Sequence, residues 1–242
     1  MYLKTFLATL SSVFLFASFV YADCPHGDAL WDRQEYQTAE RYYMECARKN
    51  DSDALYKLGL IYKNGYVEQQ KDVIKGLSFL RFSAENGYAP AQRELGEALL
   101  ELEQSESGRQ IISEYQEKIQ PASKGTGILA RAKRTDLSPY AWILLAAEKK
   151  ENKWYYPCKA VSDEKAIQII QESRMGKDAR TKAVTEAGMW KMNKLRSTAK
   201  EILHLDEYRT FERAVFSEQA SPADRASAMG YLKQKIDMRK NE

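Results

Sequence analysis

The chain has 242 residues, of which 44% are hydrophobic and 29% are charged. This composition is ordinary for a soluble globular protein with one or two domains and enough apolar residues for a sizeable core. The formal net charge is +3, from 37 Lys and Arg against 34 Asp and Glu. Electrostatic binding of nucleic acid needs a concentrated basic surface, so this near balance argues against a nucleic-acid partner.

The first 22 residues differ in pattern from the rest of the chain. Lys4 is followed by an uncharged, mostly apolar run from Thr5 to Ala22, with Val20 and Ala22 placed three and one positions before a predicted cut after Ala22. This is typical of a secretory signal peptide, so we expect residues 1–22 to be removed and the mature protein to be periplasmic or secreted. The alternatives are an uncleaved membrane anchor and a lipid on Cys24, which the intervening Asp23 disfavours. No later stretch is long enough to span a membrane.

Three cysteines remain after removal of that segment, namely Cys24, Cys46 and Cys158. An exported protein meets an oxidising environment in which one pair could be bridged. The sequence favours a Cys24–Cys46 disulfide, which would close a loop of about 20 residues and contribute roughly 3 kcal/mol in the chain-entropy model. The alternative is that Cys46 is a small buried apolar residue without a covalent partner.

A self-similarity with an offset of 37 residues lies in the first hundred residues. It aligns small and large apolar residues at six positions: Ala39 with Gly76, Tyr43 with Leu80, Ala47 with Ala84, Ala54 with Ala91, Leu58 with Leu95, and Gly59 with Gly96. The apolar spacing predicts a helix over 54–63, ended by Asn64 and Gly65, and a second helix over 72–86, ended by Asn86 and Gly87. Neither helix could bury its apolar face alone, so stacked hairpins are expected.

The stretch "ALYKLGLIYKNGYVEQQKDVIKGLSFLRFSAENGYAPAQRELG", residues 54–96, resembles the Sel-one-like repeat, a relative of the tetratricopeptide repeat. The matching positions are Ala54, Leu58, Gly59, Tyr62, Gly65, Val67, Asp72, Ala84, Gly87, Ala89, Ala91, Gln92, Leu95 and Gly96. Departures at Tyr66, Gly76, Phe79 and Ser83 change packing residues only. The resemblance implies an all-α right-handed solenoid of helix-turn-helix repeats, with a partial copy at 29–59 and a degenerate copy at 138–150, offset by 63 residues from the best copy.

The remaining chain is also predicted to be helical. Helices are expected at 162–174, 179–204, 206–217 and 221–239, the last with Ser221 and Asp224 as a cap, and Ser138 is expected to cap the helix of the degenerate copy. The expected layout is therefore repeats at 23–119, a linker and degenerate repeat at 120–161, and irregular C-terminal helices at 162–242. An aromatic segment at 151–158, which ends in Cys158, is expected to be either a packing element or part of a binding surface.

The sequence contains no recognisable pattern of catalytic residues. The two histidines, His26 and His204, lack zinc-site spacing, and no serine or cysteine has a nucleophile motif. Carboxylates such as Glu97 and Asp163 are predicted to lie on solvated helix faces. We therefore expect no metal, no cofactor and no enzymatic activity.

The resemblance implies an exported scaffold or adaptor that binds another protein in an envelope-associated complex. Candidate surface residues are Tyr36, Tyr62, Tyr66, Arg81 and Arg93. Two other classes stay open. Relatives with repeated cysteine pairs are linked to β-lactam or cell-wall binding or hydrolysis, and other exported members could act as secreted effectors.

Overall fold

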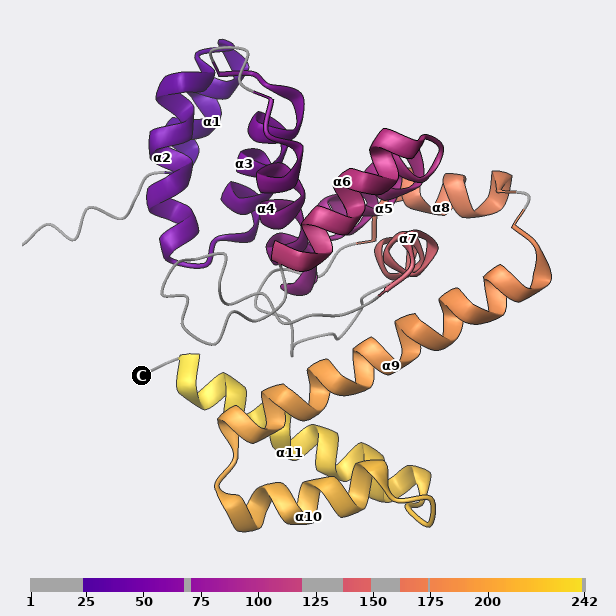
Figure 1. Cartoon of the computed structure of the whole chain (residues 1–242). Helices are drawn as coiled ribbons and strands as arrows, with labels where there is room; N and C mark the ends of the chain where they lie inside the picture. Colours follow the sequence, from indigo (N-terminus) through magenta and orange to yellow (C-terminus); the bar gives the residue numbers. More distant parts are fainter. Residues whose placement is uncertain (1–23, 68–70, 119–136, 149–161, 174, 241–242) are drawn as a thin grey trace, which may run out of the picture.

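The computed structural model describes residues 24–67, 71–118, 137–148, 162–173 and 175–240, and these ranges contain eleven helices and no strand (Figure 1). The predicted all-α class is confirmed for these residues. The helices are α1 (Cys24–Asp32), α2 (Tyr36–Arg48), α3 (Ser52–Asn64), α4 (Val73–Glu85), α5 (Ala89–Glu103), α6 (Glu106–Lys118), α7 (Pro139–Ala147), α8 (Glu164–Glu172), α9 (Lys177–Ile202), α10 (Leu205–Phe216) and α11 (Pro222–Lys240). The expected signal peptide, the linker at 120–126 and the segment at 151–158 lie outside the described residues.

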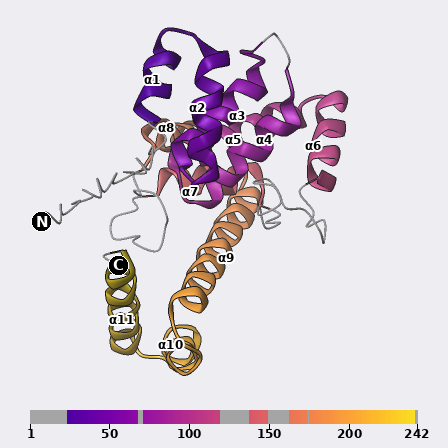
Figure 2. The same ribbon diagram turned by 90° about the vertical axis from the view of Figure 1, so that its left-hand side faces the viewer.

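The helices form two groups joined by one long helix. Helices α1 to α8 pack together, and α9, with 26 residues, contacts α7 through residues such as Trp190 and then extends away from this group. Helices α10 and α11 pack against each other and against α9, well away from the first group (Figures 1 and 2). The buried side of α9 therefore packs against α7 in one part and against α10 and α11 in another, because the helix is long enough to reach both.

Helices α1 and α2 form a hairpin at the N-terminal end of the described chain. The predicted disulfide between Cys24 and Cys46 is present and joins the first residue of α1 to a buried position of α2, with the two Cα atoms 6.3 Å apart. The hydroxyl of buried Tyr43 donates a hydrogen bond to Asp28 of α1 at 2.8 Å. The sequence indicated only part of a repeat from residue 29 onward, whereas the structure contains a complete helical hairpin that begins at Cys24.

Helices α3 and α4 form the hairpin that the best repeat copy predicted. The Asp51 carboxylate accepts from the backbone N–H of Ala54 and starts α3, and Gly65 ends it with φ of +71°. A Cβ on Gly59 would lie 2.6 Å from Cγ of Leu80, so the absence of a side chain lets α3 approach α4 closely. The predicted bounds of both helices agree with the observed ones to within two residues.

Helix α5 packs more closely against α7 than against α6, the helix that follows it in the chain. A Cβ on Gly96 would lie 2.5 Å from Ile143 of α7, as one on Gly59 would contact Leu80 of α4. Ile143 follows Leu80 by 63 positions, the offset of the degenerate copy. Helix α6 lies beside α4 and α5 instead (Figure 1). The irregular offset thus has a physical reason, because α6 and residues 119–136 separate α5 from its packing partner.

A backbone hydrogen bond joins the residue before each of α3, α5 and α8 to the preceding helix, across five residues in the first two cases and 17 in the third. In each case the N–H of the residue that precedes or starts the new helix donates to a carbonyl in the last turn of the preceding one. The bonds join Asp51 to Cys46, Tyr88 to Ser83 and Asp163 to Ala146, at 3.2, 3.3 and 2.9 Å. Asn50 and Gly87, which are 37 positions apart, both have positive φ, +64° and +88°. The sequence offset therefore corresponds to recurrent backbone geometry.

The four helices predicted after residue 161 are present as α8 to α11. The predicted cap of α11 is also present, since the Ser221 hydroxyl accepts from the N–H of Asp224 and donates to its carboxylate. Ser138 does precede α7, but its hydroxyl caps no N–H, and its backbone N–H donates to Glu186 of α9 instead. Within the described ranges, no helix is long and apolar enough to cross a bilayer.

Replacement of Gly96 by Ala tests the close approach of α5 to α7. The new methyl group would overlap Ile143 and the Pro139 carbonyl, so we expect the free energy of unfolding to fall by about 1 to 3 kcal/mol. Gly188 of α9 is the matched control, because a Cβ added there would have no neighbour within 4 Å. Gly188→Ala should raise stability by about 0.5 to 1 kcal/mol through helix propensity. Urea unfolding measures the free energy of unfolding of both variants. Equal changes for Gly96→Ala and Gly188→Ala would contradict the close contact between α5 and α7.

The Cys24–Cys46 disulfide can be tested by a double serine variant. We expect a loss of about 2 to 4 kcal/mol in the free energy of unfolding, because the bond restricts the unfolded chain and holds α1. Amide hydrogen exchange should become faster in α1 than in α5. An unchanged midpoint of unfolding would show that α1 is held by other contacts alone.

Candidate functional site

Three partly exposed aromatic side chains gather where α1, α2 and the end of α3 meet; we call Trp31, Tyr36 and Tyr66 the aromatic patch. The rings of Tyr36 and Tyr66 stack at 4.7 Å between centroids, and Trp31 contacts both edgewise at 5.1 and 5.9 Å. Lys57 of α3 places its Nζ 4.4 Å from the Trp31 ring centroid. Tyr66 keeps 42% of its surface exposed. These rings are therefore rigid but accessible.

A polar pocket of about 430 Å³ adjoins the patch, and it opens between α2, the end of α3 and the start of α4. Its lining residues are Gln37, Glu40, Arg41, Ile61, Tyr62, Val67, Asp72 and Lys75. The Tyr62 hydroxyl donates to Glu40, and its ring stacks on Phe79 while Lys75 Nζ lies 3.6 Å from the ring centroid. Burial, together with the nearby Glu40 carboxylate, raises the pKa of Tyr62 well above its usual range.

The patch and the pocket form one continuous surface, which we call the N-terminal surface. Tyr36 and Glu40 are one turn apart on α2, and Tyr66 and Val67 are adjacent in the chain. Two acidic and two basic side chains in the pocket balance each other, and Asp72 also caps α4. Aromatic side chains and Arg are enriched at protein interfaces. The arrangement suits recognition of another polypeptide.

The structure brings Tyr36, Tyr62 and Tyr66 together but places the two predicted arginines elsewhere. Arg81 is only 3% exposed, and its guanidinium pairs with Glu85 at 2.9 Å and contacts Tyr115 of α6. The prediction that Arg81 contributes to the surface is therefore wrong. Its role is to hold α6 against α4.

Arg93 is also an interior link rather than a surface contributor. Its guanidinium donates to Asp163 at 3.1 Å and to Glu97, so it ties α5 to the start of α8. Asp163 has a side chain that is only 9% exposed, and it caps α8 by accepting from the N–H of Ala166. The prediction that Asp163 lies on a solvated helix face is wrong, because the residue combines a cap with a partly buried ion pair.

The repeat-signature residues mostly shape the helices. Ala54, Leu58, Ala84, Ala91 and Leu95 are fully or almost fully buried. Gly59 and Gly96 permit close helix contacts, Gly65 and Gly87 adopt positive φ, and Asp72 caps α4. Three of the matched positions, Tyr62, Val67 and Asp72, also line the pocket of the N-terminal surface.

Trp31 and Lys57 were not predicted as site residues. Trp31 lies outside the matched repeat copy, in a helix that the periodicity did not separate from α2. Its position three residues before Gln34, which ends the α1 turn with φ of +64°, gave no recognisable signal in the sequence. The aromatic composition near Tyr36 was the one available hint.

Both histidines make contacts that belong to the fold. The His26 ring lies 4.6 Å from that of Tyr42, and His204 caps α10. Among the residues that the structure places, no three His, Cys, Asp or Glu side chains are grouped as a metal site would require.

Comparison with protein-family models, with curated proteins and with solved structures finds no match to this chain.

Tyr115 gives the fold a predicted sensitivity to alkaline pH. Burial raises the pKa of its phenol to about 12, although Arg81 beside it opposes the shift. An unfolded tyrosine ionises near pH 10, so the stabilising effect is complete below pH 10 and is lost as pH rises towards 12. Tyr115→Phe cannot ionise, and between pH 9 and 11.5 it should lose about 1 to 2 kcal/mol less stability than the parent. If urea unfolding shows that the parent and Tyr115→Phe lose the same stability between pH 9 and 11.5, Tyr115 is not the group responsible.

Proposed function

We propose that this protein is an exported helical-repeat adaptor that binds another protein through the N-terminal surface. The observation that carries the proposal is the aromatic patch, in which three rings are fixed by mutual contacts yet stay partly exposed. Rigid aromatic side chains lose little conformational entropy on binding and are enriched among residues that dominate binding energy. A role limited to packing would favour complete burial of these rings.

The proposal includes the repeat architecture. Helices α1 to α5, α7 and α8 would form a short right-handed solenoid of the Sel-one-like type, with α6 as an insertion. Support comes from the recurrent backbone hydrogen bonds before α3, α5 and α8 and from the equivalent contacts of Gly59 and Gly96. A solenoid presents side chains that can vary without disturbing the buried core, which suits an adaptor.

The proposed location is the periplasm or the exterior of the cell, with residues 1–22 removed after Ala22. The disulfide supports this, because such bonds persist in oxidising compartments. The partner is expected to be a component of an envelope-associated complex.

The experiment places a photo-cross-linking amino acid at position 66 in the full-length protein, expressed in its native host. We expect one predominant protein adduct after irradiation, identified by mass spectrometry. The matched control carries the same amino acid at Met189 of α9, which is 62% exposed, and should give no such adduct. In the cross-linkable background, Trp31→Ala should reduce the yield at least about fivefold, which corresponds to the loss of one aromatic anchor.

Two results would contradict the proposal. The first is equal labelling from positions 66 and 189, which would indicate collision rather than recognition. The second is turnover of a β-lactam or of peptidoglycan by the purified mature protein together with no adduct, which would favour the cell-wall class. Export of the tagged chain beyond the envelope would instead favour an effector.

A further inference from the structure

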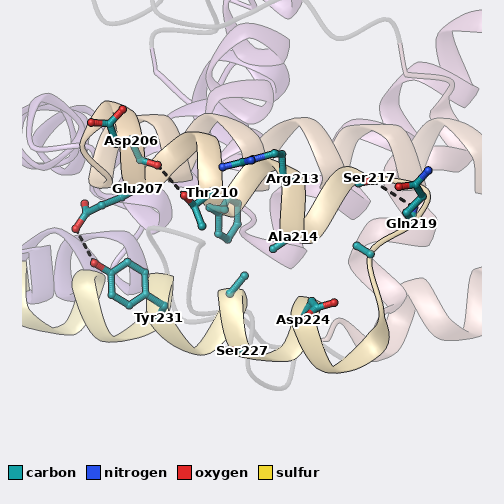
Figure 3. A pocket seen from close by; sticks show the side chains of 13 residues that line it. Asp206, Glu207, Thr210, Arg213, Ala214, Ser217, Gln219, Asp224, Ser227 and Tyr231 are labelled. Atoms are coloured by element: carbon teal, nitrogen blue, oxygen red, sulfur yellow. Dashed lines mark hydrogen bonds between the residues drawn. The ribbon is translucent and has the colours of Figure 1, made fainter.

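A second surface feature lies at the other end of the molecule, in the hairpin of α10 and α11. A groove of about 830 Å³ opens between these helices (Figure 3). Small side chains dominate its walls, and the lining also includes buried Phe211. The small lining residues are Thr210, Ala214, Ser217, Ala220, Ser227 and Ala228. Helix α9 contributes no residue to this lining, so the groove lies on a face of the hairpin that α9 leaves open.

The acidic residues of the groove lie at its two ends. Helices α10 and α11 are antiparallel, because Tyr231 bonds to Glu207 at the start of α10 while Arg225 bonds to the Ser217 carbonyl at its end. Each helix begins with acidic residues, so Asp206 and Glu207 mark one end and Asp224 marks the other (Figure 3). Arg213 is the one basic residue in the lining. The lining therefore carries three acidic side chains and one basic side chain.

Glu207 and Asp224 stay ionised at neutral pH. Hydrogen bonds from Lys235, from Tyr231 and from the His204 backbone lower the pKa of Glu207 to about 2. Bonds from Ser221 likewise lower the pKa of Asp224. The Asp206 side chain is 95% exposed, with Arg209 as a loose neighbour at 3.6 Å. Asp206 is thus the acid most accessible to an incoming group.

The charge arrangement distinguishes between possible occupants. Two copies of this groove packed face to face about a two-fold axis would place acidic ends opposite acidic ends, because both ends of the groove carry acids. A basic partner would meet opposite charge at both ends. Small residues on two antiparallel helices leave room for a third helix to lie between them. Helix α10 has 12 residues, about 18 Å at the usual helical rise, which matches about three turns of a partner.

We propose that the groove between α10 and α11 binds an amphipathic helix of a partner protein that carries an apolar stripe and Lys or Arg near both ends. The stripe lies over Phe211 and Ala214, and the basic residues approach Asp206 and Asp224. This surface is separate from the N-terminal surface and does not depend on it.

The test uses the full mature protein and a fluorescently labelled 14-residue helical peptide of Ala and Leu with two Lys residues at each end. A second peptide has Glu in place of Lys. Fluorescence anisotropy should show saturable binding of the cationic peptide, weakened by salt, and no binding of the anionic one. Asp206→Lys should weaken the binding at least tenfold. Asp178→Lys is its control, because Asp178 is also an exposed acid in the first turn of a helix.

A second pair of variants tests the shape of the groove independently of charge. Ala214→Gln should fill the groove and weaken binding of the cationic peptide at least tenfold. Ala226→Gln, at an exposed position of α11 outside the lining, should leave the affinity unchanged. Circular dichroism verifies that all four variants keep their helices. Tyr66→Ala should also leave peptide binding unchanged, which separates this test from that of the N-terminal surface.

Three results would overturn the inference. They are equal binding of the cationic and anionic peptides, no binding of the cationic peptide by the folded parent, and equal weakening by the control variants. Light scattering tests whether a second copy of the chain occupies the groove instead. A parent dimer that Ala214→Gln converts to a monomer would show that it does.

Discussion

Close contact between paired helices at two glycines is the constraint on which the N-terminal group of helices depends. At Gly59 and Gly96 the neighbouring helix comes so near that a single methyl group would overlap Leu80 or Ile143. This contact fixes the distance within each pair, and the backbone hydrogen bonds at Asp51, Tyr88 and Asp163 fix how each pair leads into the next. The surface side chains on α2, α3 and α4 are positioned by these two kinds of contact.

The two proposed surfaces differ in how they are supported. The N-terminal surface lies on tightly packed helices, where Tyr62 stacks on Phe79 and the disulfide holds the α1 helix that carries Trp31. The α10–α11 groove lies on a hairpin that contacts the rest of the described chain mainly through α9. Salt bridges such as Lys235 to Glu207 are partly exposed and contribute little to stability. A rigid surface suits recognition by preformed shape, while the hairpin presents a simpler helical groove with charge at its ends.

The sequence predicted the helices well and the surfaces only in part. Helix limits followed from Gly65, Gly87 and the Ser221 cap, whose conformational preferences are local and therefore readable from the chain. The disulfide was predictable because it needs only two cysteines at a plausible separation. Arg81 and Arg93 were misplaced because charge alone predicts exposure, whereas Glu85 and Asp163 compensate these charges in the interior. The degenerate copy at 138–150 did indicate the partner of α5, whereas the position of α6 beside α4 and α5 had no signal in the repeat pattern.

The central claim is that a partner protein contacts the N-terminal surface. Amide hydrogen exchange of the mature protein, alone and in complex with the captured partner, tests this claim most directly. Slower exchange is expected in the complex at residues 31–41 and 62–67, with α9 unchanged. Protection confined to α9, or no difference between the free and bound protein, would contradict it.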